Sequence, residues 1–392
     1  MNTTAKEPRK LLMVTTIPIT IKAFLLPYAD HFRARGWRVD AMARGIGDAS
    51  GNLTDRFDKL FDVQWSRNPF SPANFTQAPG QILEAVRAEA YDIVHVHTPV
   101  AAFVTRRTLR KLRRKGRPKI VYTAHGFHFH AGGRALRNTL YRRLEVAAGK
   151  WTDRLVVINE EDRRAAERYR IVPETALVQM PGIGLDFSAY APEKITRDDV
   201  RNVRRQMGVK DEEILFTMVA EFSPGKHHQD VVEALARMER QDVHVAFAGS
   251  GTTMGQTKEL AERLDVPKQV HFLGFRQDVP VLLRASRAAI LSSEREGLAR
   301  SLMEAACMGT PIIGSDARGV IDIVRPHRGL VYPVGDVYAL RDAMLQMCEA
   351  PYPPVSPDPA WRIEHLIALH EELYANLFAN GENEKGDISD AG

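Results

Sequence analysis

Two glutamates in the last third of the chain have a spacing that suits the binding of a sugar and a nucleotide. Glu296 and Glu304 stand in the segment S-S-E-R-E-G-L-A-R-S-L-M-E-A-A-C, residues 292–307. An apolar run precedes this segment and apolar residues recur within it at helical spacing, so we expect a strand, a turn and a helix. Glu296 would then lie at the start of the helix and Glu304 about two turns along it.

The turn before this helix could bind phosphate. Gly297 allows close approach to the backbone, and the N–H groups of the first helical turn, near Leu298 and Ser301, suit an anion. Lys226, in the turn E-F-S-P-G-K-H-H (221–228), adds a cation suited to a diphosphate. With two carboxylates for sugar and ribose hydroxyls, the pattern fits a nucleotide sugar. The alternative is an ordinary strand-turn-helix with solvated charges.

Histidines gather at the ends of two other apolar runs. His125 follows the run 121–124 and precedes a glycine, so its imidazole could donate a hydrogen bond to a sugar hydroxyl at a strand end. His128 and His130 follow in a glycine-bounded loop that could close over an acceptor or a lipid. His95 and His97 alternate with valines and point to one face of a strand, either as core histidines or on the acceptor side. We expect no metal site, because none of these histidines has the spacing of a zinc motif.

Charge divides the chain into a basic and an acidic part. Residues 1–187 hold 31 Lys and Arg against 18 Asp and Glu, a net charge of +13, and the remainder carries −8. The densest basic run lies within 106–119 and is followed by a second cluster at 134–143. The candidates for contact with an acceptor or a membrane are five arginines of the first run: Arg106, Arg107, Arg110, Arg113 and Arg114. A basic helix face beside apolar residues fits an anionic membrane surface. Nucleic acid is the competing partner, and a merely solvated helix face is the third reading.

The elements that must position these residues alternate along the chain. In the first half strand-like runs cover 11–16, 38–42, 60–65, 93–97, 119–124 and 154–158, with helical patterns at 21–35, 79–89, 100–115 and 135–148. A second series opens with the strand 214–220 after a polar connection. Alternation of this kind predicts parallel sheets covered on both faces, which bind ligands at the carboxyl ends of their strands.

Length and composition place the chain among soluble two-domain proteins. It has 392 residues and two cysteines, which are too few for a disulfide framework or a zinc cluster. No apolar run is long enough to span a bilayer, and the first residues lack the pattern of a signal peptide. We therefore expect a cytoplasmic protein, held peripherally at the inner face of the plasma membrane.

Two motifs carry a resemblance to a known family. The stretch E-G-L-A-R-S-L-M-E-A-A-C-M-G-T-P-I-I resembles the E-x7-E signature of the retaining glycosyltransferases of family 4, which have the GT-B fold. T-A-H-G-F-H-F resembles the T-x-H motif of the bacterial exopolysaccharide and capsule branch. The likeness runs from about 11 to 340. It implies that His125 contacts the donor sugar, Lys226 the diphosphate, Glu296 the sugar and Glu304 the ribose.

The same resemblance suggests further donor contacts. Gly249 and Gly251 match the family's G-x-G turn near the nucleotide, and Phe275 and Arg276 match positions that meet the base. Uracil is the expected base.

The chain also departs from the family pattern at two places. The arginine that commonly accompanies the phosphate lysine is replaced by Glu221, and Arg300 is a candidate to compensate. The first loop lacks the glycine pair of many family members, and the resembled branch often has a lysine where Lys22 stands. Lys22 is therefore a candidate contact to acceptor or phosphate, with a solvated lysine at the start of a helix as the alternative.

Together these observations predict an α/β protein with two doubly wound Rossmann-like domains facing a cleft. The expected domains are an acceptor-binding domain at 1–187, a nucleotide-sugar-binding domain at 188–356, a closing helix at 357–379 that returns to the first domain, and a disordered tail at 380–392. The expected reaction transfers a hexose or N-acetylhexosamine from a UDP-sugar to a lipid-linked glycan, with retention. Because the chain has no D-x-D triplet and needs no cofactor for this chemistry, we expect metal independence. A nucleotide-sugar epimerase and a non-catalytic glycan- or membrane-binding protein are the alternatives.

Overall fold

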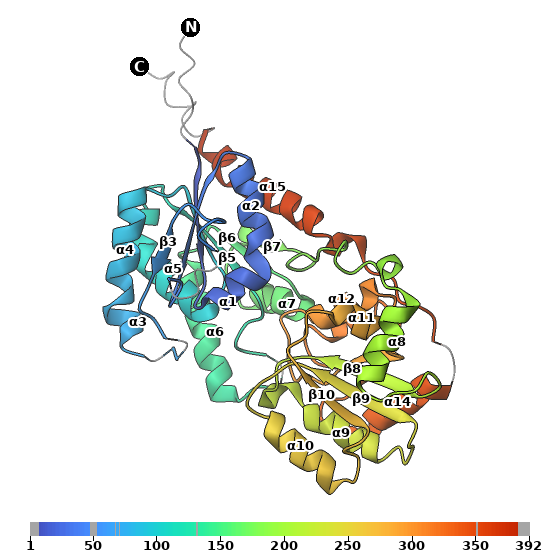
Figure 1. Cartoon of the computed structure of the whole chain (residues 1–392). Coiled ribbons are helices and arrows are strands. Elements are labelled where there is room, and N and C mark those ends of the chain that lie inside the picture. Colours follow the sequence, from blue (N-terminus) through green and yellow to red (C-terminus); the bar gives the residue numbers. More distant parts are fainter. Residues whose placement is uncertain are drawn as a thin grey trace, which may run out of the picture. The chain divides into compact units, whose positions relative to one another are not determined.

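The chain folds into two compact α/β units (Figure 1). The computed structural model describes residues 8–47, 53–66, 68–69, 71–130, 132–349 and 352–382. Unit 1 comprises Met1–Gly184 and Ile363–Gly392, and unit 2 comprises Leu185–Arg362. The first boundary therefore falls three residues before the one expected from the sequence.

Unit 1 is built on a seven-stranded parallel sheet in the order β3-β2-β1-β4-β5-β6-β7. Its strands are β1 (Lys10–Val14), β2 (Arg38–Ala43), β3 (Leu60–Asp62), β4 (Ile93–Val96), β5 (Lys119–Ala124), β6 (Arg154–Val157) and β7 (Leu177–Gln179). Its helices are α1 (Pro18–Thr20), the π-helical η1 (Ile21–Leu25), α2 (Leu26–Ala34), α3 (Ala73–Thr76), α4 (Ala78–Glu89), α5 (Pro99–Arg113), α6 (Ala135–Gly149), α7 (Glu160–Arg168), η3 (Glu174–Ala176) and α15 (Ile363–Glu382).

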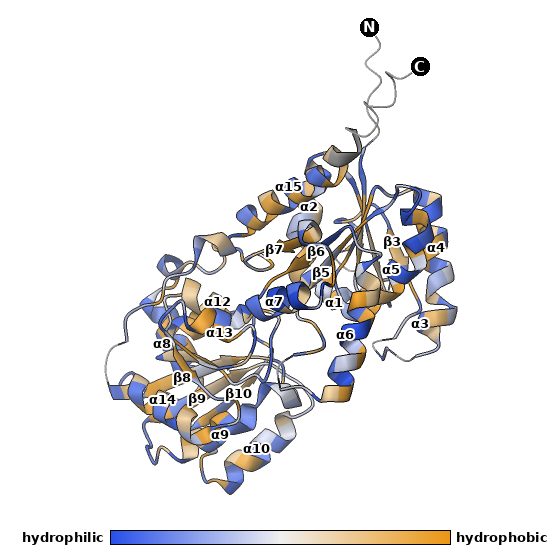
Figure 2. Ribbon diagram, turned by 180° about the vertical axis from the view of Figure 1, so that it is seen from behind, coloured by the Kyte–Doolittle hydropathy of each residue, from blue (hydrophilic) through white to orange (hydrophobic). Residues whose placement is uncertain are grey.

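Alternation along β1 shows why helices must cover both faces of this sheet. Leu11 and Met13 pack in one apolar cluster with residues of α2 and α15, whereas Leu12 and Val14 pack in another with α4 and α5. Parallel strands buried on both faces are apolar at nearly every position, and the strands of Figure 2 are accordingly coloured as hydrophobic, in contrast to the strongly hydrophilic α7. The C-terminal α15 lies beside α2 and so completes unit 1.

The bounds of α15 differ from those expected for the closing helix. It begins at Ile363, since the preceding residues belong to unit 2, and it continues through Glu382, three residues into the predicted tail. The rest of that tail, 383–392, lies outside the described residues.

Unit 2 is built on a six-stranded parallel sheet in the order β10-β9-β8-β11-β12-β13. Its strands are β8 (Ile214–Val219), β9 (Val243–Ala248), β10 (Val270–Gly274), β11 (Ala288–Leu291), β12 (Ile312–Ser315) and β13 (Leu330–Tyr332). Its helices are η4 (Pro192–Lys194), α8 (Arg197–Gln206), η5 (Pro224–Lys226), α9 (His228–Ala236), α10 (Met254–Arg263), α11 (Val279–Arg284), α12 (Arg300–Cys307), α13 (Ile321–Val324), α14 (Val337–Glu349) and η6 (Pro359–Trp361).

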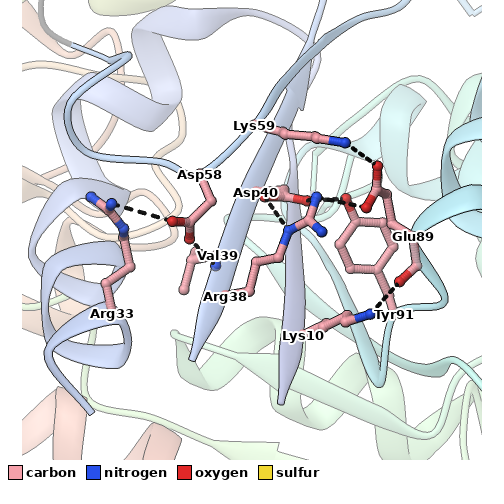
Figure 3. Close-up of polar contacts among 9 residues, drawn as sticks. All are labelled: Lys10, Arg33, Arg38, Val39, Asp40, Asp58, Lys59, Glu89 and Tyr91. Atoms are coloured by element: carbon pink, nitrogen blue, oxygen red, sulfur yellow. Dashed lines mark hydrogen bonds and ion pairs between the residues drawn. The ribbon is translucent and has the colours of Figure 1, made fainter. Parts of the chain in front are cut away.

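Charged residues near the amino ends of β1 and β2 in unit 1 form a closed network (Figure 3). Asp40 is fully buried and accepts hydrogen bonds from the Arg38 guanidinium, at 3.0 and 3.3 Å, and from the Tyr91 hydroxyl. Arg38 also pairs with Glu89 at 2.6 Å, and Glu89 accepts from Lys59 at 2.5 Å. Because the buried Asp40 and the largely buried Glu89 are both paired with cations, this network is a structural feature of the fold. In open parallel sheets, ligands bind at the carboxyl ends of the strands, which is the opposite edge of each sheet.

Candidate active site

In unit 2, the loops that follow the neighbouring strands β8 and β11 are hydrogen-bonded to one another. The turn after β8 includes Lys226, and the turn after β11 runs from Ser292 to Ala299. The Ser292 hydroxyl donates to the carbonyl oxygens of Lys226 and His227, at 2.8 and 3.0 Å. The Glu294 N–H donates to Gly225 O at 2.9 Å. Residues far apart in the sequence are thereby held at one point of the carboxyl edge.

The two predicted residues Lys226 and Glu296 meet at this point. The Lys226 ammonium donates to Glu296 Oε1 across 70 residues of sequence. The Ser293 hydroxyl donates to the same oxygen at 2.7 Å. The side chains of Lys226 and Glu296 are 24% and 16% exposed, so both remain accessible to a ligand. Ser293 was not singled out from the sequence, although its place three residues before Glu296 was a usable signal.

The loop after β12 fixes the backbone around Glu296. The Glu296 N–H donates to Arg318 O at 2.9 Å, and the buried Arg318 side chain donates through Nε to Glu296 O at 3.2 Å. Gly319 has φ +73°, and a Cβ there would lie 2.7 Å from Glu296 O. Only glycine therefore allows this close packing. Arg318 is a second residue that the sequence pattern did not single out.

Helix α12 carries the second signature glutamate. It begins at Arg300, two residues later than expected, so Leu298 lies in the preceding turn and Ser301 is the second helical residue. Glu304 is buried and accepts a hydrogen bond from Arg300 Nε at 2.9 Å. Burial, together with the nearby Glu304 carboxylate, raises the pKa of the Tyr190 hydroxyl. Tyr190 is therefore a further member of this environment that sequence reasoning missed.

Arg300, the candidate to replace the usual phosphate arginine, forms an ion pair with Glu304. Glu221 is exposed just after β8. Lys226 is thus the cation that the structure places against Glu296, whereas Arg300 lies with the other glutamate.

The predicted glycine turn and base contacts lie at the ends of β9 and β10. A Cβ on Gly249 would lie 1.9 Å from Ala220 O, and one on Gly251 would lie 2.3 Å from Phe222 O, so both glycines are required for backbone packing. Phe275 is 81% exposed. The Arg276 guanidinium is held by Asp278 at 2.7 and 2.5 Å.

In unit 1 the candidate His125 lies against other histidines. His97 Nδ1 is 3.3 Å from His125 Nε2, and the ring of His97 stacks on that of His95 with centroids 4.1 Å apart. His370 of α15 lies 5.8 Å, centroid to centroid, from His95. A cavity of about 20 Å³, about the space that one water requires, lies among these rings. The sequence predicted that His95 and His97 share a face, but not that α15 adds His370.

These histidines are neutral at ordinary pH. Burial lowers the pKa of His370 to about 4, and burial together with the neighbouring His370 lowers the pKa of His125 to about 4. Burial also holds the pKa values of His95 and His97 well below the usual value. Neutral imidazole carries one donor and one acceptor nitrogen. The cluster can therefore orient hydrogen bonds without adding charge.

The other predicted acceptor-side residues lie at the same edge of unit 1. Lys22 is exposed in η1, shortly after β1. His128 meets Tyr141 of α6 edge-on, with ring centroids 5.1 Å apart. The loop that joins β5 to α6 is held by Asn138, whose side-chain amide donates to His130 O at 2.8 Å.

The prediction that Arg106 belongs to an exposed basic face of α5 is wrong. Arg106 is fully buried, donates to Glu145 Oε2 at 2.8 Å and lies over the Tyr122 ring at 4.1 Å. Arg113 is half-buried and pairs with Asp153 at 2.9 Å. Helical spacing placed both arginines on α5 correctly, but net charge cannot show which of them find partners inside the fold. The exposed members are Arg107 and Arg114, with Arg110 half-exposed.

Neither metal ligation nor membrane spanning is indicated by the part of the chain that the structure describes. Among those residues, no three His, Cys, Asp or Glu side chains form a group that could hold a metal ion. Within the same residues, none of the helices combines the length and apolarity needed to cross a bilayer.

Comparisons with known proteins match both units. The family described as "Glycosyltransferase Family 4" matches residues 24–187, and the family described as "Glycosyl transferases group 1" matches residues 199–356. The chain is 31% identical to the glycosyltransferase EpsD of Bacillus subtilis over 346 residues, 88% of each chain. It is 27% identical over 309 residues to the Escherichia coli UDP-Gal:alpha-D-GlcNAc-diphosphoundecaprenol alpha-1,3-galactosyltransferase, covering 76% of this chain and 78% of that one. Anabaena Alr3699/HepE in complex with UDP-glucose has a similar fold, with a TM-score of 0.73, 17% identity, and coverage of 95% and 99% of the two chains.

Proposed function

Because the chain belongs to glycosyltransferase family 4, with the GT-B fold of two Rossmann-like domains, we propose a specific reaction for it. It transfers a hexose or N-acetylhexosamine from a UDP-sugar to a hydroxyl of a lipid-linked glycan, with retention of the anomeric configuration. The context is the synthesis of an exopolysaccharide, capsule or O-antigen type of glycan.

The contact between Lys226 and Glu296 is the observation that carries this proposal. A lysine ammonium is suited to a diphosphate, and a carboxylate is suited to sugar hydroxyls. At the point where they meet, the two groups can hold the two halves of a nucleotide sugar on either side of the bond that breaks. Glu304, in the middle of α12, then binds the ribose hydroxyls.

In this reaction the protein orients the substrates and stabilises the negative charge that develops on the leaving diphosphate. Lys226 and the N–H groups at the start of α12 stabilise the departing diphosphate. An oxygen of that diphosphate accepts the proton of the acceptor hydroxyl on the same face of the sugar, so no carboxylate nucleophile and no divalent metal are required. His125 donates a hydrogen bond to the transferred sugar, and Glu296 orients it.

Relatives support a uridine nucleotide and a lipid-linked acceptor. The E. coli relative is named for UDP-Gal and for a GlcNAc-diphosphoundecaprenol acceptor, and the Anabaena protein of similar fold binds UDP-glucose. EpsD, which is 31% identical over 88% of each chain, supports the exopolysaccharide branch.

A pocket on unit 1 has the chemistry of a phosphate-bearing glycan acceptor. It has a volume of about 490 Å³ and lies between α6, α7 and the loop that follows His125. Arg142 and Arg168 place guanidinium groups 4.7 and 5.5 Å from the Tyr169 ring, and Arg164 lines the same pocket. Arginine forks bind phosphate, and an aromatic ring packs against a sugar. This pocket is therefore our candidate for the acceptor diphosphate and its first sugar.

We place the membrane contact on α6. Leu136 is 90% exposed and Leu140 is 40% exposed on this helix, and Arg137 and Arg143 are exposed on it too. Exposed leucines among arginines suit the boundary of an anionic bilayer, whereas phosphates of nucleic acid would leave the leucines without apolar partners. We propose that the protein is cytoplasmic and is held peripherally at the inner face of the plasma membrane.

A donor-binding screen tests the proposed reaction. Thermal shift is measured with UDP, GDP, ADP and their common sugars. Ligand at a hundredfold excess over its Kd should stabilise the folded state by about 3 kcal/mol. We expect a selective response to UDP and to one UDP-sugar. A GDP response would overturn the base assignment, and silence toward all nucleotides would favour a non-catalytic binding protein. Turnover of that UDP-sugar to its epimer without any acceptor would favour the epimerase.

Vesicle flotation tests the membrane surface separately. Leu136→Ser with Leu140→Ser should release the protein from anionic vesicles. Arg107→Gln with Arg114→Gln on α5, which removes charge without touching α6, serves as the control and should float much as the parent does. Equal release by both pairs would contradict the placement on α6.

A further inference from the structure

The hydrogen bond between two histidines in unit 1 constrains where His125 carries its proton. His97 Nδ1 lies 3.3 Å from His125 Nε2, so one of these nitrogens donates to the other. Both rings are neutral, because burial holds the pKa of each below its usual value. A neutral imidazole has a single N–H, which leaves two possible arrangements.

The buried Nε2 of His97 distinguishes the two arrangements. Within the described residues this nitrogen has no hydrogen-bond partner. If His125 were the donor, His97 would have to carry its own proton on Nε2, where no protein atom among the described residues accepts it. Orphaned buried N–H groups are rarer in proteins than under-satisfied acceptors. The favoured arrangement therefore has His97 donating through Nδ1–H to His125 Nε2.

His97 is itself held rigidly. His95 stacks on it with ring centroids 4.1 Å apart and an interplanar angle of 30°. Both nitrogens of His95 are engaged, Nδ1 with the Tyr374 hydroxyl at 2.6 Å and Nε2 with the Thr123 hydroxyl at 2.8 Å. Because Tyr374 belongs to α15, the closing helix supports the ring that supports His125.

We propose that His97 is a positioning residue that fixes His125 as the Nδ1–H tautomer, so that Nδ1–H is the donor which His125 offers to the transferred sugar. The hydrogen bond from His125 to the sugar rests on the proposed function. The tautomer of His125 does not depend on that function. Without the donor at position 97, His125 could exchange its proton between the two nitrogens and rotate. The ring would then spend part of its time in a form that cannot donate correctly.

Two substitutions separate hydrogen bonding from packing. His97→Asn keeps an amide N–H close to the position of Nδ1, and His97→Phe keeps a planar ring but removes the donor. We expect His97→Phe to lower kcat by about tenfold to a hundredfold, as for other residues that hold a catalytic group, with the KM for UDP-sugar changed by less than about twofold. His97→Asn should recover most of the lost turnover. Equal losses in the two variants would overturn the proposal.

The tautomer can be read without any turnover. Nitrogen-15 NMR of histidine-labelled protein distinguishes Nδ1–H from Nε2–H, and the His125 signals are assigned by their disappearance in His125→Gln. We expect the Nδ1–H form in the parent and in His97→Asn, and a growing Nε2–H fraction in His97→Phe. An Nε2–H form in the parent would overturn the proposal even if His97→Phe failed to fold.

The two readouts also separate this proposal from the function on which it rests. Full transferase activity in His125→Gln would overturn the catalytic role of His125, and with it the catalytic half of this inference. The tautomer half is judged by the spectra alone.

Discussion

Replacing Glu296 by glutamine should strengthen UDP binding while it weakens turnover. The Lys226 ammonium is hydrogen-bonded to the Glu296 carboxylate, so the diphosphate of the proposed donor must compete for it. At an effective dielectric constant of 20, two unit charges about 4 Å apart attract by roughly 4 kcal/mol. Desolvation cancels most of this, and pairs as accessible as this one retain about 1 kcal/mol. Glutamine keeps the shape but removes the charge.

The expected gain in UDP affinity is therefore about fivefold to tenfold, since 1.4 kcal/mol corresponds to a factor of ten. Turnover should fall by about a hundredfold, because the sugar loses an acceptor oriented for the transition state. Titration calorimetry with UDP measures the first effect, and initial rates at saturating donor measure the second.

Glu294→Gln provides the matched control. Glu294 lies in the same loop, its side chain is 44% exposed, and its substitution changes the net charge equally. Its expected effect on UDP affinity is below twofold. An unchanged or weaker affinity for UDP in Glu296→Gln would show that the diphosphate does not compete for Lys226. An equal gain in UDP affinity in both variants would show that the gain comes from the loss of one negative charge near the site, and not from the release of Lys226.

Three further predictions concern stability and metal dependence. Arg106→Met leaves Glu145 as an unpaired buried charge and should cost about 3–5 kcal/mol of unfolding free energy in denaturant melts, whereas the exposed Lys111→Met should cost less than about 0.5 kcal/mol. His370 has a folded-state pKa of about 4 against about 6.5 unfolded, so the unfolded state binds its proton first as the pH falls. Stability is then full above pH 6.5 and falls by about 3 kcal/mol toward pH 4, and a flat profile in urea melts would contradict this. Excess chelator should leave transfer rates unchanged; a loss restored by magnesium or manganese would show that a divalent ion participates.

The sequence predicted the elements of unit 1 closely because their apolar periodicity is strong. β5 was placed at its observed bounds, and α6 was placed to within one residue of its end. β7 was missed, since three residues following a short 3-10 turn carry too little pattern. The end of α15 was placed too early because its last residues are polar, while propagation of a helix already docked on unit 1 requires little hydrophobicity.

The candidate site was predictable where it depended on local sequence. Glu296, Lys226 and Glu304 could be named from their motifs, but the bond between Lys226 and Glu296 depends on the neighbouring positions of β8 and β11 in the sheet. Arg106 shows the reverse case. As an arginine within a basic run, it was predicted to lie on the surface. Its partner Glu145 lies 39 residues away on α6, and a local sequence pattern cannot predict a pair so far apart.

Exposure and the number of partners distinguish the structural charges of this protein from those that a ligand can use. Asp40 is fully buried and its carboxylate accepts from Arg38 and Tyr91, and Arg106 is fully buried among Glu145, Thr152 and the Ala102 carbonyl. A ligand cannot reach these groups, and removing one partner would leave an uncompensated buried charge. Lys226 and Glu296 also pair, but each keeps part of its side chain in contact with solvent. Under the proposed function, we therefore expect a diphosphate to replace the carboxylate at Lys226 without unfolding of the surrounding loops, and the released carboxylate to bind the sugar. The contact between Lys226 and Glu296 would then be the one that donor binding exchanges.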